Sequence, residues 1–139
     1  MTERQAMDLQ RIDPEQAKSL LDSDEGYTYV DVRSAEEFQE GHVPGAVNIP
    51  LLNRSPSGLG MLPNPNFLDD VEGRFGKDDK IITACLRGGR SMKAAQILVV
   101  NGFTKIVDMR GGYDGEIDQA GNVTFPGWAR RDLPTTQGD

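Results

Sequence analysis

Cys85, the only cysteine of the 139-residue chain, stands in a stretch that combines a thiol with glycines and cationic side chains. The stretch reads Cys-Leu-Arg-Gly-Gly-Arg-Ser and precedes a helix-forming segment, so that Arg87 and Arg90 flank Gly88 and Gly89. Glycines let the backbone curl tightly enough for successive N–H groups to converge on one point. Those amides, the helix start and the two arginines all favour negative charge nearby. The stretch therefore predicts a stabilised thiolate that acts as a nucleophile without a dedicated base.

Composition alone leaves other roles open for this thiol. A free cysteine is often a buried core residue, and it can also pair with a second molecule. One cysteine cannot form an internal disulfide, and with a single histidine the chain has no Cys/His set of metal ligands, so we expect no metal. Core filling would account for the thiol but not for the glycines and arginines beside it.

The elements that must position this stretch are short β-branched runs that alternate with helical segments, a pattern typical of a parallel sheet with crossover helices. The expected strands are Leu9–Ile12, Tyr27–Val32, Ala46–Ile49, Ile81–Ala84 and Lys105–Met109. We therefore expect an α/β domain with a central parallel sheet of about five strands and helices on both faces. Cys85 then lies at the carboxyl edge of this sheet, where open α/β sheets bind their ligands.

Capping signals mark where the helices begin. The expected helix starts are Asp13-Pro14, Ser34-Ala35-Glu36-Glu37 and Asn64-Pro65. In the third of these helices the apolar residues at helical spacing should face the core, namely Phe67, Leu68, Val71 and Phe75. A fourth helix is expected from about Arg90 to Asn101, with Gly102 in a left-handed conformation at its end.

Two segments fit none of these elements. Leu51–Pro65 is a long connection rich in Gly, Pro, Ser and Asn, and loops of this length are usually functional or disordered. Residues 116–127 hold Ala120-Gly121-Asn122 between short polar strands, which predicts a hairpin. The last residues, from Thr135 onward, are expected to fray.

Length and composition predict one soluble domain over residues 1–139. The net charge of −7 argues against a nucleic-acid surface. No apolar run approaches the roughly 18 residues of a membrane span, and the first residues lack the pattern of a secretory signal. We therefore expect a cytoplasmic protein that binds neither nucleic acid nor membranes.

The order of the motifs resembles that of the rhodanese-like sulfurtransferases. The stretch from Cys85 to Ser91 is similar to their active-site pattern C-x-x-G-x-R-S. Three further motifs agree in order, namely Asp31-Val32-Arg33, Gly41-His42-Val43-Pro44-Gly45-Ala46 and Gly111-Gly112-Tyr113. The resemblance covers about residues 9–134 and is closest to the plant-type single-domain members, which carry a similar connection at 51–65.

This resemblance implies a three-layer rhodanese domain and a sulfurtransferase activity. Cys85 would take a sulfur atom from thiosulfate or a related small anionic donor, hold it as a persulfide and release it to cyanide or a thiol acceptor. The resemblance implies no metal or organic cofactor. The residues expected to bind substrate are Leu86, Arg87, Gly88, Gly89, Arg90 and Ser91.

The polar side chains of this loop carry different expectations. Arg87 is expected to meet the sulfonate of thiosulfate through charge and forked hydrogen bonds. Arg90 points either inward to loop carbonyls or outward to substrate. Ser91 bonds back to the loop, donates to the sulfur or only starts the helix.

Three other activities use the same thiol. Related cell-cycle phosphatases place five residues between cysteine and arginine, whereas four intervene here, Leu86 to Gly89, and this shorter loop argues against a phosphatase or arsenate reductase. A persulfide carrier that serves a protein partner would use identical residues. A regulatory binding module would not need the cysteine.

Residues outside the loop are expected to support it. Asp31 and Arg33 should brace the end of the sheet, and His42 should bond loop backbone and not act as a base. Single-domain members carry Trp where this chain has Glu116, and Trp128 opens a displaced copy of their ending, so 116–127 is interpreted as a twelve-residue insertion. We hypothesise that this insertion borders the active-site mouth.

Overall fold

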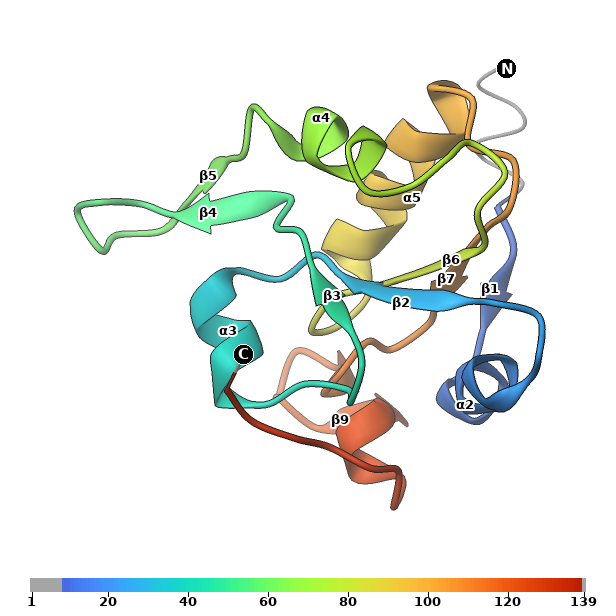
Figure 1. The fold of residues 1–139 in the computed structure, drawn as a ribbon. Helices are drawn as coiled ribbons and strands as arrows, with labels where there is room; N and C mark the ends of the chain where they lie inside the picture. Colours follow the sequence, from blue (N-terminus) through green and yellow to red (C-terminus); the bar gives the residue numbers. More distant parts are fainter. Residues whose placement is uncertain (1–8, 139) are drawn as a thin grey trace.

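The structure, a computed structural model, describes residues 9–138 and has a five-stranded parallel sheet at its centre (Figure 1). The strands run in the order β1-β7-β6-β2-β3. Their bounds are β1 Arg11–Ile12, β2 Thr28–Asp31, β3 Val47–Asn48, β6 Ile81–Ala84 and β7 Ile106–Met109. The predicted α/β class and all five predicted strand positions are confirmed, with bounds that differ by no more than a few residues.

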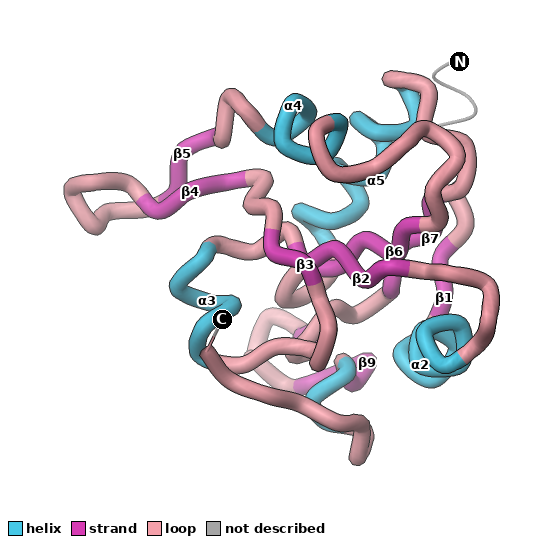
Figure 2. Tube along the Cα trace, in the orientation of Figure 1, coloured by secondary structure: helices cyan, strands magenta, loops and turns pink. Residues whose placement is uncertain are grey.

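Helices lie against both faces of this sheet (Figure 2). Their bounds are α2 Pro14–Asp22, α3 Ala35–Glu40, α4 Phe67–Glu72, α5 Gly89–Val100 and the 3-10 helix η1 Trp128–Arg130. Asp13 caps α2 before Pro14 and a capping box begins α3, both as predicted. The Gln16 side chain completes a capping box at α2 as well, which was not predicted. α4 begins later than the predicted Asn64-Pro65, because the Asn64 side chain donates to Pro50 O (2.8 Å) and accepts from Asn66 N (3.0 Å) instead of capping a helix.

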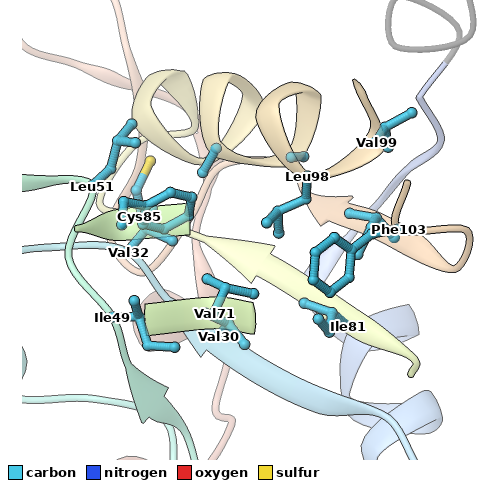
Figure 3. Close-up of a cluster of buried hydrophobic side chains, with 14 residues drawn as sticks. Val30, Val32, Ile49, Leu51, Val71, Ile81, Cys85, Leu98, Val99 and Phe103 are labelled. Atoms are coloured by element: carbon cyan, nitrogen blue, oxygen red, sulfur yellow. The ribbon is translucent and has the colours of Figure 1, made fainter. Parts of the chain in front are cut away.

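Two hydrophobic clusters hold the layers together. The first joins the sheet to α4 and α5, and its members include Val30, Val32, Ile49, Leu51, Val71, Ile81, Leu98 and Phe103 (Figure 3). The second lies on the opposite face against α2 and η1, and its members include Ile12, Ala17, Tyr29, Ile82, Ala84, Met109 and Trp128. The three-layer arrangement is therefore the predicted one.

β6 is the strand that positions the cysteine. Its four residues are fully buried, with Ile81 in one hydrophobic cluster and Ile82 in the other. β6 pairs with β2 on one side and β7 on the other, all in parallel. Strands buried on both faces are expected to be mostly apolar, and three of these four residues are, Thr83 being the exception. Cys85 thus follows a central strand at the carboxyl edge of the sheet.

Two antiparallel hairpins lie outside the sheet. β4 (Leu52–Arg54) pairs with β5 (Met61–Pro63) in the segment for which the sequence predicts only a long loop, and Figure 1 shows this hairpin projecting from the body. Its turn closes because Gly58 and Gly60 adopt positive φ angles of 80° and 79°. β8 (Gly115–Ile117) pairs with β9 (Val123–Pro126) in the predicted hairpin segment.

The chain after β9 returns to the body. Trp128 is buried, donates its indole N–H to Pro134 O (2.7 Å) and packs edge-on against Tyr29. Beyond it, Thr136 forms an antiparallel bridge with His42, so the prediction that the end frays is wrong for this residue because its backbone groups find partners there. Within residues 9–138, the helices lack the length and apolar character that crossing a bilayer requires.

Candidate active site

Cys85 is both buried and hydrogen-bonded through its sulfur. The residue is 2% exposed and lies at one end of the first hydrophobic cluster, beside Leu51 (Figure 3). The backbone N–H of Gly88 donates to its Sγ at 3.0 Å. In the part of the chain that the structure describes, this is the one backbone amide bonded to the sulfur, where the sequence predicts a ring of several. The thiol is therefore packed like a core residue and still meets a polar donor.

Gly88 bends the chain between the cysteine and α5. Its φ of 113° lies in the left-handed region, and it occupies the N-cap position of α5. A Cβ here would approach Arg11 Nη2 to 2.9 Å, so a larger residue would also collide with a side chain behind the loop. The first N–H groups of a helix have no intrahelical acceptor, and the helix dipole adds positive potential at the same end. A negative charge on the sulfur is favoured there.

The Gly112-Tyr113 segment braces the loop from behind. Tyr113 N donates to Cys85 O (2.8 Å), and Asp114 N donates to Leu86 O (2.9 Å). Gly112 lies so close that a Cβ would fall 2.4 Å from Cys85 O. The third motif of the sequence thus fixes the backbone on which the cysteine sits.

Arg90 ties the loop to α3 instead of bonding loop carbonyls. Its Nη1 and Nη2 donate to the two carboxylate oxygens of Glu37 at 2.7 and 3.0 Å. Burial opposes ionisation of Glu37, but the hydrogen bonds and charge of Arg90, with help from Ser34, lower the pKa of Glu37 to about 2. Glu37 is also the last residue of the capping box of α3, so one carboxylate serves the helix and the loop together.

Arg87 is held on the other side of the loop. Its Nη1 lies 3.1 Å from Asp114 Oδ2 and donates to Gly115 O at 3.1 Å. The contact joins the loop to the first residue of β8, at the root of the β8–β9 hairpin. Both arginines that the sequence singles out therefore have carboxylate partners.

A buried polar cluster lies beneath the start of α5. Asp108 is fully buried, accepts from Thr83 Oγ1 (2.9 Å) and pairs with Arg11 Nε (3.1 Å). Burial raises the pKa of Asp108, against the opposing effects of hydrogen bonding and of the charge of Arg11. Ser91 donates its hydroxyl to Gly88 O at 3.3 Å, which is the back-bonding among its expected roles.

The supporting residues outside the loop behave as expected. Asp31 and Arg33 form a buried pair with Nη2 and Oδ2 2.8 Å apart, and Arg33 also donates to Gly41 O. His42 stacks on Phe38, and its Nδ1 is 2.7 Å from Phe38 O, so Nδ1 carries the proton and donates. The Asp31–Arg33 pair and His42 therefore hold backbone in place, as a supporting role requires.

The surface beside the loop has a depression of about 300 Å³. It is lined by Arg33, Glu37, Glu40, Gly41, Leu86, Tyr113 and Asp114. A second cavity of about 340 Å³ borders α2 and η1, and no loop residue lines it. Leu86, the residue after Cys85, is the one residue of the Cys85–Ser91 stretch that lines the first depression.

Sequence reasoning missed several of these contacts. The capping box identified Glu37 only as a helix signal, and nothing in the sequence links it to Arg90, 53 positions away. Asp114 and Arg11 belong to no motif that we recognised. The sequence shows the Gly111-Gly112-Tyr113 motif, but only the folded structure shows that this motif contacts the backbone of the cysteine loop.

The chain is similar in sequence to a known family of domains. A family model described as Rhodanese-like domain matches residues 13–116. The protein "Thiosulfate sulfurtransferase 16, chloroplastic" of Arabidopsis thaliana is 44% identical over 110 residues, which are 79% of this chain and 80% of that one. "Protein HIGH ARSENIC CONTENT 1, mitochondrial" of the same plant is 37% identical over 111 residues, 80% of this chain and 63% of its own length.

A solved structure gives the same result for the fold. The crystal structure of Rv0390 from M. tuberculosis superposes with a TM-score of 0.76 at 27% identity. The match covers 92% of this chain and 97% of that one. The matched family region ends at residue 116, where the β8–β9 hairpin begins to depart from the motif pattern.

Proposed function

Because the chain belongs to the rhodanese-like domain family, we propose that it is a sulfurtransferase whose Cys85 carries the transferred sulfur as a persulfide. The observation that carries this proposal is the hydrogen bond from Gly88 N to Cys85 Sγ at the start of α5. A core cysteine needs no such donor, whereas a sulfur that must bear negative charge does. The similarity to a protein named thiosulfate sulfurtransferase supports the same chemistry.

The first half-reaction loads the cysteine. The Cys85 thiolate attacks the outer sulfur of thiosulfate, and a new S–S bond forms as the S–S bond of the donor breaks. The electron pair of the broken bond leaves on sulfite, and the outer sulfur stays on the enzyme as a persulfide anion. No external oxidant or base is required, because the thiolate and thiosulfate together carry the same charge and electrons as the persulfide anion and sulfite that they form.

The second half-reaction releases the sulfur. Cyanide or a thiolate acceptor attacks the outer sulfur of the persulfide, and the Cys85 thiolate departs as the leaving group. The S–S bond places the outer sulfur about 2 Å beyond Sγ, and this distance matters because Sγ itself is 2% exposed. The acceptor therefore needs to reach only the outer sulfur.

The loop residues contribute backbone donors and a fixed shape. Gly88 supplies the hydrogen bond to Sγ, and the amides of Gly89 and the following turn are available to the outer sulfur as a helix N-terminus is to any anion. Leu86 walls the depression, and Arg90 holds the loop against α3 through Glu37. Arg87 is the cation assigned to the anionic head of the donor.

A protein acceptor is the second candidate for the physiological partner. The depression beside the loop, of about 300 Å³, lies at the surface, where a protein thiol could bind as well as cyanide. In such a carrier, transfer to a protein thiol would be fast and turnover with thiosulfate and cyanide slow. The same residues perform both tasks.

The experiment that tests the proposal compares the rate of sulfur transfer with the rates of phosphate-ester hydrolysis and arsenate reduction. Purified protein is given thiosulfate with cyanide, thiosulfate with a thiol, a phosphate ester, and arsenate with a thiol, in parallel. We expect product formation in the first two assays and a Cys85→Ser variant that is inactive in both. Phosphate release or arsenate reduction faster than thiocyanate formation would contradict the proposal and favour the oxyanion chemistry instead.

A further inference from the structure

Both loop arginines already have carboxylate partners, with which an anionic donor must compete. Arg87 is paired with Asp114, and Arg90 is paired with both oxygens of Glu37. Arg87 is also the more accessible of the two, with its side chain 39% exposed against 22% for Arg90. Arg87 is therefore the loop cation that is more open to solvent, and Asp114 is the carboxylate that accompanies it.

Asp114 is held in this position by its own backbone. Its N–H donates to Leu86 O at 2.9 Å, and its carbonyl accepts from Arg130 Nε at 2.7 Å. The carboxylate is divided between two guanidinium groups, with Oδ2 facing Arg87 and Oδ1 at 3.0 Å from Arg130 Nη2. Rotation of the carboxylate away from the loop would break both of these ion pairs.

The depression beside the loop adds to the negative character of this entrance. Glu37, Glu40 and Asp114 line it, and the one arginine in its wall, Arg33, is buried against Asp31. Glu37 is paired with Arg90, and Asp114 is paired with Arg87 and Arg130, so each carboxylate offsets cationic charge near the loop. Asp114 therefore weakens the attraction of Arg87 for an anionic donor, and the loss is larger for a donor with two negative charges than for a donor with one.

We propose that Asp114 is a specificity-determining residue that disfavours dianionic sulfur donors, so that the site is suited to donors with a singly charged or uncharged leaving group, such as organic thiosulfonates and persulfides. This inference rests on the proposed sulfur transfer and names the donor class for it. Asp114 does so by neutralising Arg87 and by placing a carboxylate in the wall of the depression that Leu86 also lines. The chemistry at Cys85 is the same for both donor classes.

Two matched donors test the proposal. Thiosulfate carries two negative charges, and methanethiosulfonate replaces one charged oxygen with a methyl group while keeping the S–S bond that must break. KM and kcat are measured for both donors with the wild type, Asp114→Asn and Asp114→Glu. Asp70→Asn is the control, because this exposed carboxylate on α4 lies outside the loop and its contacts, and its loss changes the net charge equally.

Asp114→Asn should lower the KM for thiosulfate about three- to tenfold. The Asp114 carboxylate would then no longer compete with thiosulfate for Arg87, and it would no longer repel the donor. The KM for methanethiosulfonate should fall by a smaller factor, and kcat should stay within about twofold for both. Asp114→Glu should keep the donor preference of the wild type, and Asp70→Asn should match the wild type for both donors. Adding Arg87→Gln should abolish most of the effect of Asp114→Asn, because the two residues act as one pair.

Other outcomes overturn the inference. An unchanged KM for thiosulfate in Asp114→Asn, with a melting temperature near that of the wild type, would show that the pair does not control donor charge. Equal changes for both donors, or an equal effect of Asp70→Asn, would assign the effect to loop packing or net charge. Absence of turnover by the wild type with either donor would overturn the proposed function and this inference with it.

Discussion

Substitution of Gly112 tests most directly whether the Gly112-Tyr113 segment holds the backbone of Cys85 and Leu86 in place. A Cβ on Gly112 would lie 2.4 Å from Cys85 O and 2.7 Å from both the carbonyl carbon and oxygen of Leu86. These are backbone atoms, which cannot rotate aside as a long side chain can. The φ of 63° also lies in the left-handed region that L-residues disfavour. The Gly112→Ala variant must therefore displace the loop.

The size of the effect follows from these two terms. The left-handed conformation costs an alanine about 1–2 kcal/mol. Forcing a methyl group into packed surroundings adds about 1–3 kcal/mol. Gly121→Ala is the matched control, because Gly121 has a φ of 86° with no atom within 4 Å of its Cβ position, so that only the conformational cost applies.

Thermal unfolding of the two variants, with the rate of persulfide formation, is the assay. Gly112→Ala should melt about 2–12 °C below Gly121→Ala, taking about 2–4 °C per kcal/mol for a chain of this size. It should also form persulfide more slowly, since Cys85 moves with its carbonyl, whereas Gly121→Ala should match the wild-type rate. Equal melting temperatures and equal rates in the two variants would refute the reasoning that Gly112 braces the loop.

Three further predictions concern the surroundings of the loop. Glu37 ionises with a pKa of about 2 in the fold and near its ordinary 4.5 when unfolded, so its pairing stabilises the protein above about pH 4.5 and ceases to do so as the pH falls toward 2. The gap in unfolding free energy between the wild type and Glu37→Gln, about 1–3 kcal/mol at pH 7, should therefore close at low pH in urea titrations. His42→Ala should lose about 1–3 kcal/mol of stability, because Phe38 O loses its donor, and keep its rate of persulfide formation; a loss of roughly a hundredfold with the fold intact would mark His42 as a base. Removal of residues 116–127 should raise turnover with a protein thiol more than with cyanide, and unchanged turnover with both acceptors would contradict a role of the hairpin at the mouth.

The parts of the fold that could be predicted depend on local signals. The strand Ile81–Ala84 is mostly apolar and rich in β-branched residues, and the glycines after Cys85 indicate the turn into α5. The cap before proline at Asp13 and the capping box at Ser34 identify the starts of α2 and α3 to the residue. These signals lie within a few positions of the feature that they determine, so one sequence was enough to place the thiol at the carboxyl edge of the sheet.

The partners of the loop could not be predicted, because they come from distant positions. Glu37 reaches Arg90 across 53 positions, and Arg11 reaches Asp108 across 97. Asp114 is closer in sequence to Arg87, but it pairs with that residue only because the backbone after Gly112 runs beside the loop. The pairing of β4 with β5 was missed for a different reason, since Pro and Gly in that segment indicate turns more strongly than its short strands indicate pairing.

The most direct test of the central claim, that the sulfur held by Gly88 N carries the transferred atom, is the intact mass of the protein after incubation with a sulfur donor. The wild type and the Cys85→Ser variant are each incubated with thiosulfate or with methanethiosulfonate and then measured. We predict the gain of one sulfur atom by the wild type, its removal by cyanide, and no gain by the variant. An unmodified wild type with both donors, or an equal gain by the Cys85→Ser variant, would contradict the account.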